Sequence, residues 1–273
     1  MMHLENNFYP NAATLEKLIS GAQVLEDLTI DNSITYRPRV IQVRSQTLKR
    51  IDISRCTYAV IDAPLLECLI TKADQIKHYT ITNSSFPAKL DIGVLSLFGQ
   101  SEDVIRDILA DIARVKDLVI SSFLWKCMYQ GLKSGAPLPP FRHLSCLNAT
   151  FTIFDLEVLT TLLNNCPNLE SLILELVKET SMFNMFRSDP KVKFSTVAGC
   201  LVSSLKFVEL KSSISKYEIE MELVRYFLQN SPILEKLRVN SHYSGKAKSA
   251  ILDQLLAMPR CSSACEILLL YTS

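Results

Sequence analysis

The sequence predicts an α/β repeat protein in which short parallel strands alternate with amphipathic helices. A short leucine-containing motif recurs along the 273 residues, and segments with helical spacing of apolar residues lie between its copies. Hydrophobic residues make up 48% of the chain and charged residues 21%, a balance that is typical of a protein with a large buried core.

The motif is clearest in three segments that read Leu-Glu-x-Leu-x-apolar after a helix end and a polar turn. These segments begin at Leu25, Leu169 and Leu234. In two of them Pro167 and Pro232 end the preceding helix at the same offset, because proline cannot continue a helix. Looser copies of the pattern begin at Leu48, Leu66, Ile76, Val115, Phe141, Leu205 and, as the last, Cys265.

The spacing of these copies indicates the kind of repeat. Most adjacent motifs start 18 to 36 residues apart, which centres on the length of leucine-rich repeats. In such repeats the regularly placed apolar side chains point inward, and the residues between them stand on the opposite face of a short strand. The sequence therefore predicts an irregular leucine-rich-repeat solenoid with a parallel sheet on its concave face and helices on its convex face.

Between the motifs, residues 101–113, 155–163 and 218–228 are predicted to be helices, because apolar residues recur there at helical spacing. Two stretches lack the motif. Residues 123–140, rich in glycine and proline, are predicted to be a surface connection, and residues 180–193 a loop before the C-terminal unit. The sequence thus predicts a repeat region over residues 1–193 and a separate unit over residues 194–273.

Charge and targeting signals exclude several classes of protein. The net charge is +1, which argues against binding to nucleic acid or to an anionic membrane surface. The N-terminus lacks the features of a signal peptide, and no run of eighteen uncharged apolar residues occurs. The chain is therefore expected in the cytoplasm, the nucleus or both. Its eight cysteines are expected to be reduced core thiols rather than disulfides.

The sequence contains no convincing catalytic, cofactor or metal motif. Cys261 and Cys265 suggest zinc only weakly, because structural zinc needs four ligands and the nearest histidine, His242, lies 19 residues upstream. The glycines around Lys133 have the wrong spacing for a phosphate-binding loop, and no nucleophile elbow is present. We therefore expect a protein that is not an enzyme and needs no cofactor.

Residues 205–270 resemble the FBD domain of plant F-box proteins. The resemblance rests on the Phe-Leu-x-Asn block at residues 227–230, the Leu-Glu-Lys at 234–236 and the terminal Arg-Cys-Ser-x-x-Cys at 260–265. Residues 12–176 are similar to the leucine-rich-repeat region that precedes the FBD domain in the same family. The resemblance covers nearly the whole chain and implies a solenoid that continues into a C-terminal FBD unit.

Members of this family typically begin with an F-box, which docks on the Skp-type adaptor of a cullin ubiquitin ligase. No F-box is recognisable here, and the only tryptophan, Trp125, lies in mid-chain. The resemblance implies the substrate-recognition part of an SCF-type ligase receptor, linked to adaptor and cullin only if an F-box exists outside this chain. The alternative is a stand-alone interaction protein or a degenerate family member without ligase coupling.

The predicted binding site is the concave sheet, whose solvent-facing positions carry both charges. It predicts recognition of a protein or peptide through polar contacts and matched charges, with a target that the sequence does not identify. The candidate residues are Asp27, Thr29, Arg50, Asp52, Asp117, His143, Ser171, Glu175, Glu209 and Arg238.

Overall fold

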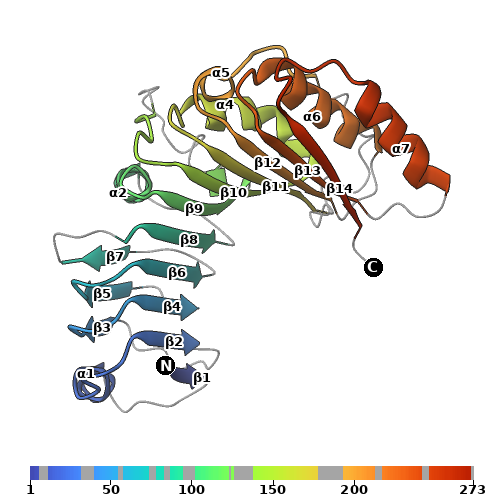
Figure 1. Ribbon diagram of the computed structural model, residues 1–273. Coiled ribbons are helices and arrows are strands. Elements are labelled where there is room, and N and C mark those ends of the chain that lie inside the picture. Colours follow the sequence, from blue (N-terminus) through green and yellow to red (C-terminus); the bar gives the residue numbers. More distant parts are fainter. Residues whose placement is uncertain are drawn as a thin grey trace. The chain divides into compact units, whose positions relative to one another are not determined.

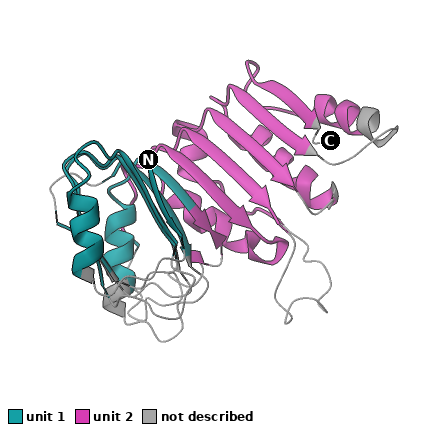
Figure 2. Cartoon of the chain, turned by 90° about the horizontal axis from the view of Figure 1, so that it is seen from below, with its two compact units in different colours: residues 1–119, 127–138 teal, residues 120–126, 139–273 magenta. Residues whose placement is uncertain are grey.

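The computed structural model divides the chain into two compact units (Figure 2). Unit 1 comprises residues 1–119 and 127–138, and unit 2 comprises residues 120–126 and 139–273. The residues that the structure describes are 1–5, 12–31, 40–54, 58–73, 78–82, 87–94, 102–122, 124–125, 138–177, 193–212, 217–241 and 246–271.

Unit 1 is built on a parallel sheet. Its strands pair in chain order, and from β2 on every second strand is skipped. They are β1 (Met2–Glu5), β2 (Asp27–Asp31), β4 (Arg50–Ser54), β6 (Cys68–Ala73) and β8 (Lys89–Val94). The predicted parallel pairing of the motif strands is confirmed. Helix α1 (Ala12–Ser20) follows β1, and α2 (Glu102–Ile112), within the helix predicted over residues 101–113, leads to β9 (Asp117–Ser121).

A second, three-stranded parallel sheet lies between the motif strands, where helices were expected except at residues 78–81. There the motif copy at Ile76 predicted a strand of the main sheet, and the strand pairs in the second sheet instead. The second sheet consists of β3 (Ile41–Arg44), β5 (Tyr58–Asp62) and β7 (His78–Ile81), which alternate with β2, β4, β6 and β8 along the chain (Figure 1). The expectation of helices throughout is wrong here. The motif starts at Leu48 and Leu66 are only 18 residues apart, and the β-branched residues of these connections favour a strand.

Unit 2 also holds parallel strands, here joined by helices. The strands are β10 (Cys146–Phe151), β11 (Ser171–Leu176), β12 (Phe207–Ser212), β13 (Lys236–Ser241) and β14 (Glu266–Tyr271). The connections carry η1 (Ile153–Val158), α4 (Leu159–Asn164), α5 (Gly199–Ser203), α6 (Tyr217–Asn230) and α7 (Lys246–Ala257), and Figure 1 shows α4 to α7 on one side of the strands. The helices predicted over residues 155–163 and 218–228 are confirmed, the first beginning as a 3-10 turn.

Burial along the strands explains why the helices lie on that side. In β11 the alternate residues Leu172 and Leu174 are completely buried, and in β13 Leu237 is as well. Facing helices contribute Leu162 from α4 and Phe227 from α6, both without exposed surface. Complete burial of such a side chain stabilises the fold by about 1.5 to 3 kcal/mol. The apolar positions of the motif therefore face the helices and leave the other face of the strands to polar residues.

The predicted surface connection over residues 123–140 is wrong at its start. Leu124 and Trp125 are 0% and 1% exposed, and the Trp125 ring meets Phe141 edge-to-face with centroids 6.0 Å apart. These large apolar side chains belong to the core of unit 2, because their burial outweighs the turn signal of the glycines and prolines that follow. Residues 126–137 lie outside the described part of the chain.

The predicted break over residues 180–193 lies almost entirely outside the described residues. On either side of it, β11 and β12 pair in parallel from Ser171 opposite Phe207 to Leu176 opposite Ser212. The division into residues 1–193 and 194–273 stays a prediction.

Candidate protein-binding face

A recurrent turn determines where each motif strand begins. The N–H of the first motif residue donates to the carbonyl three residues earlier, at 3.1 to 3.4 Å, at Leu25, Leu66, Val115, Leu144, Leu169, Leu234 and Cys265. The next two N–H groups reach the neighbouring repeat: those of Lys49 and Arg50 donate to the carbonyl of Glu26 at 2.8 and 3.0 Å. Side chains at the same motif position in successive repeats are thus held in register.

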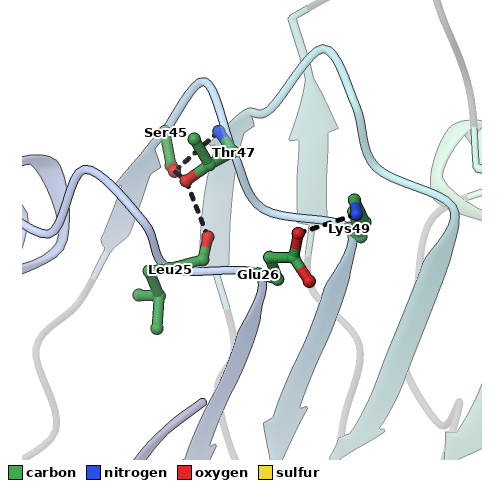
Figure 3. Close-up of polar contacts among 5 residues, drawn as sticks. All are labelled: Leu25, Glu26, Ser45, Thr47 and Lys49. Carbon is green, nitrogen blue, oxygen red and sulfur yellow. Dashed lines mark hydrogen bonds and ion pairs between the residues drawn. The ribbon is translucent and has the colours of Figure 1, made fainter.

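Polar side chains reinforce this register at the start of β2 and β4 (Figure 3). The Thr47 hydroxyl donates to the carbonyl of Leu25 at 2.7 Å, and Lys49 Nζ lies 2.7 Å from Glu26 Oε1. This hydrogen bond and the attraction of opposite charges lower the pKa of Glu26 and raise that of Lys49. Both charged side chains are exposed, so the pair adds little stability and mainly favours this strand order.

The open face of unit 1 is the face of its main sheet on which the half-buried and exposed strand residues lie. Asp27 on β2 lies in register with Arg50 on β4, and Thr29 lies in register with Asp52. The structure thus places these four predicted residues side by side. Asp117, at the start of β9, is half-buried in the alternating pattern of that strand.

Two further residues of this face, Lys89 and Asp91 on β8, were missed by the sequence analysis. They lie in register with Cys68 and Ile70 of β6. The repeat of β8 has Pro87 where the motif has its first leucine, so pattern matching passed over it. The length of this repeat and the strict alternation of apolar and polar residues around Leu90 and Ile92 are the signals that indicate a strand here.

Cys68 lies between two cations on this face. Its sulfur is 3.9 Å from Arg50 Nη1, and Lys89 is opposite on β8. Partial burial nevertheless raises the pKa of the Cys68 thiol, because desolvation outweighs the attraction of both cations. The raised pKa favours the neutral thiol over the thiolate.

The open face of unit 2, defined in the same way, centres on a buried carboxylate. Glu209 on β12 is 7% exposed. Its two oxygens accept hydrogen bonds from Asn240 Nδ2 at 2.7 Å and from Arg238 Nη1 at 3.3 Å, both on β13. Lys211 Nζ lies 4.0 Å from the carboxylate, and the Arg238 guanidinium lies 5.5 Å from the centre of the Phe207 ring. This cluster fixes the orientation of Arg238 on the face.

The cluster retains unused hydrogen-bonding capacity. Among the described residues, Arg238 Nε and Asn240 Oδ1 are buried and have no hydrogen-bond partner. Such groups are rare in folded proteins, because leaving them unpaired costs free energy. Phe207, Lys211 and Asn240 were not predicted, because their role depends on neighbours from other repeats.

The other predicted residues have different surroundings. Ser171 and Glu175 lie on β11, opposite Phe207 and Lys211 of β12, so they belong to the same face as Glu209 and Arg238. His143 does not lie on a strand, and this part of the prediction is wrong: it is exposed in the turn before β10. The turn begins at Phe141, and the motif starts three residues later, at Leu144. Cys146 therefore takes the strand position that had been assigned to His143.

The buried thiols of unit 2 are poorly suited to catalysis. Cys166 and Cys200 are 0% and 1% exposed. Burial raises the pKa of the Cys200 thiol to about 12 and raises that of Cys166 further, whereas a nucleophilic cysteine needs a lowered pKa. Within the described ranges, no group of three or more His, Cys, Asp and Glu side chains is placed to hold a metal ion. None of the described helices combines the length and hydrophobicity that a membrane crossing requires.

These strands and faces define a parallel-β repeat protein with polar residues in register on the open faces of its sheet. Residues 193–239 match the FBD family, and residues 2–21 match the Leucine Rich Repeat family. The second match spans β1 and α1, which precede the first motif copy at Leu25. The resemblance to plant F-box proteins with leucine-rich repeats and an FBD domain is confirmed.

Relatives from Arabidopsis thaliana match almost the whole chain. F-box/FBD/LRR-repeat protein At1g51370 is 54% identical over 273 residues, which cover 99% of this chain and 62% of the relative. F-box/FBD/LRR-repeat protein At5g53840 is 40% identical over 271 residues, covering 96% of this chain and 60% of the relative. The chain thus spans about three fifths of the length of these relatives. No solved structure matches the chain.

Proposed function

We propose that this chain is a non-catalytic protein-binding scaffold whose open faces recognise a target protein. In this proposal the repeats form a leucine-rich-repeat solenoid, with the open faces on its concave side and the helices on its convex side, continuing into an FBD unit over residues 194–273. The observation that carries the proposal is the set of polar and charged residues in register on neighbouring strands, above all Glu209, Arg238 and Asn240. Side chains held in fixed orientation lose little entropy when a partner binds.

The names of the relatives support a link to ubiquitin ligases. They carry an F-box beside the FBD domain and leucine-rich repeats, and an F-box family implies a Skp-type adaptor and a cullin as partners. We propose that the chain corresponds to the substrate-recognition part of such a receptor, in the cytoplasm or nucleus. The second candidate function is a stand-alone interaction protein without ligase coupling, which uses the same faces.

A pull-down from plant tissue with matched baits tests the proposal. The first bait is the unchanged chain, and the second carries Arg50→Glu, Glu175→Lys and Arg238→Ala on the open faces. A control bait carries Glu218→Lys and Asp253→Lys, both exposed and on helices. Partners identified by mass spectrometry should be lost with the second bait and kept with the control.

The outcomes separate the claims. Equal partner sets for all three baits would refute the open faces as the binding site. Co-purification of adaptor and cullin with the unchanged chain would support ligase coupling through this chain itself. Specific partners without adaptor and cullin would favour the stand-alone interaction protein.

A further inference from the structure

Strand β14 forms an edge of the unit 2 sheet and is apolar along most of its length. It pairs with β13 from Lys236 opposite Glu266 to Ser241 opposite Tyr271, and no described strand pairs with its other side. Residues 267–271 read Ile-Leu-Leu-Leu-Tyr and hold no charge. Proteins usually protect an open edge with charges, proline or a covering segment, because an unprotected edge pairs with further strands.

The core is incomplete at this edge. Ile267 and Leu269 lie in register with Leu237 and Val239 of β13, which are 0% and 3% exposed. The two β14 residues remain only half-buried. On the open face, Leu270 is 42% exposed. Apolar surface is thus exposed on both faces of the same edge.

The unpaired backbone groups of this edge can be assigned. The N–H of Glu266 donates to the carbonyl of Glu235 at 2.9 Å, so the backbone groups of residues 266, 268 and 270 face β13. Because the direction alternates along a strand, the N–H and C=O groups of Ile267, Leu269 and Tyr271 face away from the sheet.

We propose that β14 is a homodimerisation edge, which pairs in antiparallel orientation with β14 of a second copy about a two-fold axis at Leu269. In this register Leu269 faces Leu269 of the other copy, and Ile267 faces Tyr271. All are in hydrogen-bonded positions, so every outward N–H and C=O finds a partner. Leu268 then faces Leu270 on the open face, and no like charges meet.

The neighbouring register is less favourable. Centred on Leu268, the pairing would join only the outward groups of Ile267 and Leu269, leave those of Tyr271 unpaired and set Glu266 opposite Leu270. A second copy is favoured over a strand of another protein because the edge matches its own two-fold image in both hydrogen bonds and apolar residues. An interface built from one patch on both partners has this property.

Helix α7 lies beside this strand in the helix layer. It packs against β14, and its Leu252 and Leu256, four residues apart, are 36% and 54% exposed. A two-fold axis perpendicular to the sheet keeps the helices of both copies on one side. An interface centred on two paired strands is small, so the dimer should be weak and should form at micromolar concentrations.

The test is sedimentation velocity of the full chain from about 5 to about 300 μM, a range that brackets weak dimers. Two double variants differ only at one position: Leu268→Lys with Leu270→Glu sets opposite charges across the interface, and Leu268→Lys with Leu270→Lys sets like charges across it. We expect the first variant to dimerise within about threefold of the unchanged dissociation constant and the second to raise that constant at least about tenfold. A chain that stays monomeric up to the highest concentration, or double variants that behave alike, would overturn the proposal.

Hydrogen exchange provides a readout that needs no substitution. The amide of Leu269 should exchange more slowly as the protein concentration rises, whereas the amide of Leu268, already paired with β13, should be protected at every concentration. If exchange at Leu269 does not depend on concentration under conditions where a dimer sediments, the dimer uses another surface and the proposal is wrong. This test does not depend on the target-binding function, which concerns the open faces.

Discussion

Replacing Tyr226 by Phe should lower the free energy of unfolding although the ring is kept. Tyr226 on α6 is 4% exposed, and its hydroxyl donates to the carbonyl of Thr196 at 3.2 Å and accepts from the N–H of Ala198 at 3.4 Å. The ring packs against Phe194 with centroids 4.5 Å apart. The variant loses both hydrogen bonds and leaves a donor of the fully buried Ala198 without its partner. Since both bonds are long, we expect a loss of about 1 to 3 kcal/mol.

Urea denaturation followed by circular dichroism measures this loss. The control is Ser203→Ala, which removes an exposed hydroxyl that donates to the carbonyl of Gly199 at 3.0 Å within α5, and it should change the free energy of unfolding by less than about 0.5 kcal/mol. An unchanged denaturant slope would show that both variants unfold to the same extent. If the Tyr226 variant is as stable as the control, the hydroxyl does not hold residues 194–198 against α6.

Three further predictions follow from buried and exposed groups. Thr47→Val removes a 2.7 Å hydrogen bond to a main-chain carbonyl and should lower the free energy of unfolding in urea by about 1 kcal/mol. Lys49→Ala removes an exposed ion pair and should leave the urea midpoint unchanged. Equal effects of the two substitutions would contradict this. Burial raises the pKa of the Cys166 and Cys200 thiols above the ordinary value of 9.0. Their contribution to stability is therefore complete below about pH 9 and falls as the pH rises, by about 1.4 kcal/mol per pH unit for each thiol. A variant with Ala at both positions should show a flatter dependence of stability on pH, and an unchanged dependence would refute the burial of these thiols. Trp125→Ala should cost about 3 to 5 kcal/mol, and the fluorescence of this single tryptophan should shift to the red on unfolding, whereas solvent-exposed emission from the native protein would contradict its burial.

Much of the strand pattern and part of the candidate face could be predicted from the sequence. The alternation of polar and apolar residues within each motif is local, and a strand points alternate side chains to opposite faces whatever its neighbours are. Asp27, Thr29, Arg50 and Asp52 were therefore placed on one face from their positions relative to the motif leucines. Their role in binding stays a prediction.

Register and long-range packing limited the prediction elsewhere. His143 was assigned to a strand because the motif was started at Phe141, and only the turn hydrogen bond of Leu144 shows the correct start. Trp125 lies in a segment whose local signal is that of a loop, yet it is buried against Phe141. In both cases an interaction absent from the local pattern decided the structure.

The sequence by itself determined that this chain is a repeat protein with parallel strands, because a repeated motif imposes the same local structure on each copy. Only the tertiary structure decided that strands replace helices in the short repeats of unit 1, and that Glu209 meets Arg238 and Asn240 from the next repeat. It also decided that the backbone of Leu269 faces outward at a sheet edge. The physical reason is that pairing between repeats depends on which carbonyl the first N–H groups of each strand reach. That carbonyl lies in another repeat, so the local sequence of a strand does not determine it.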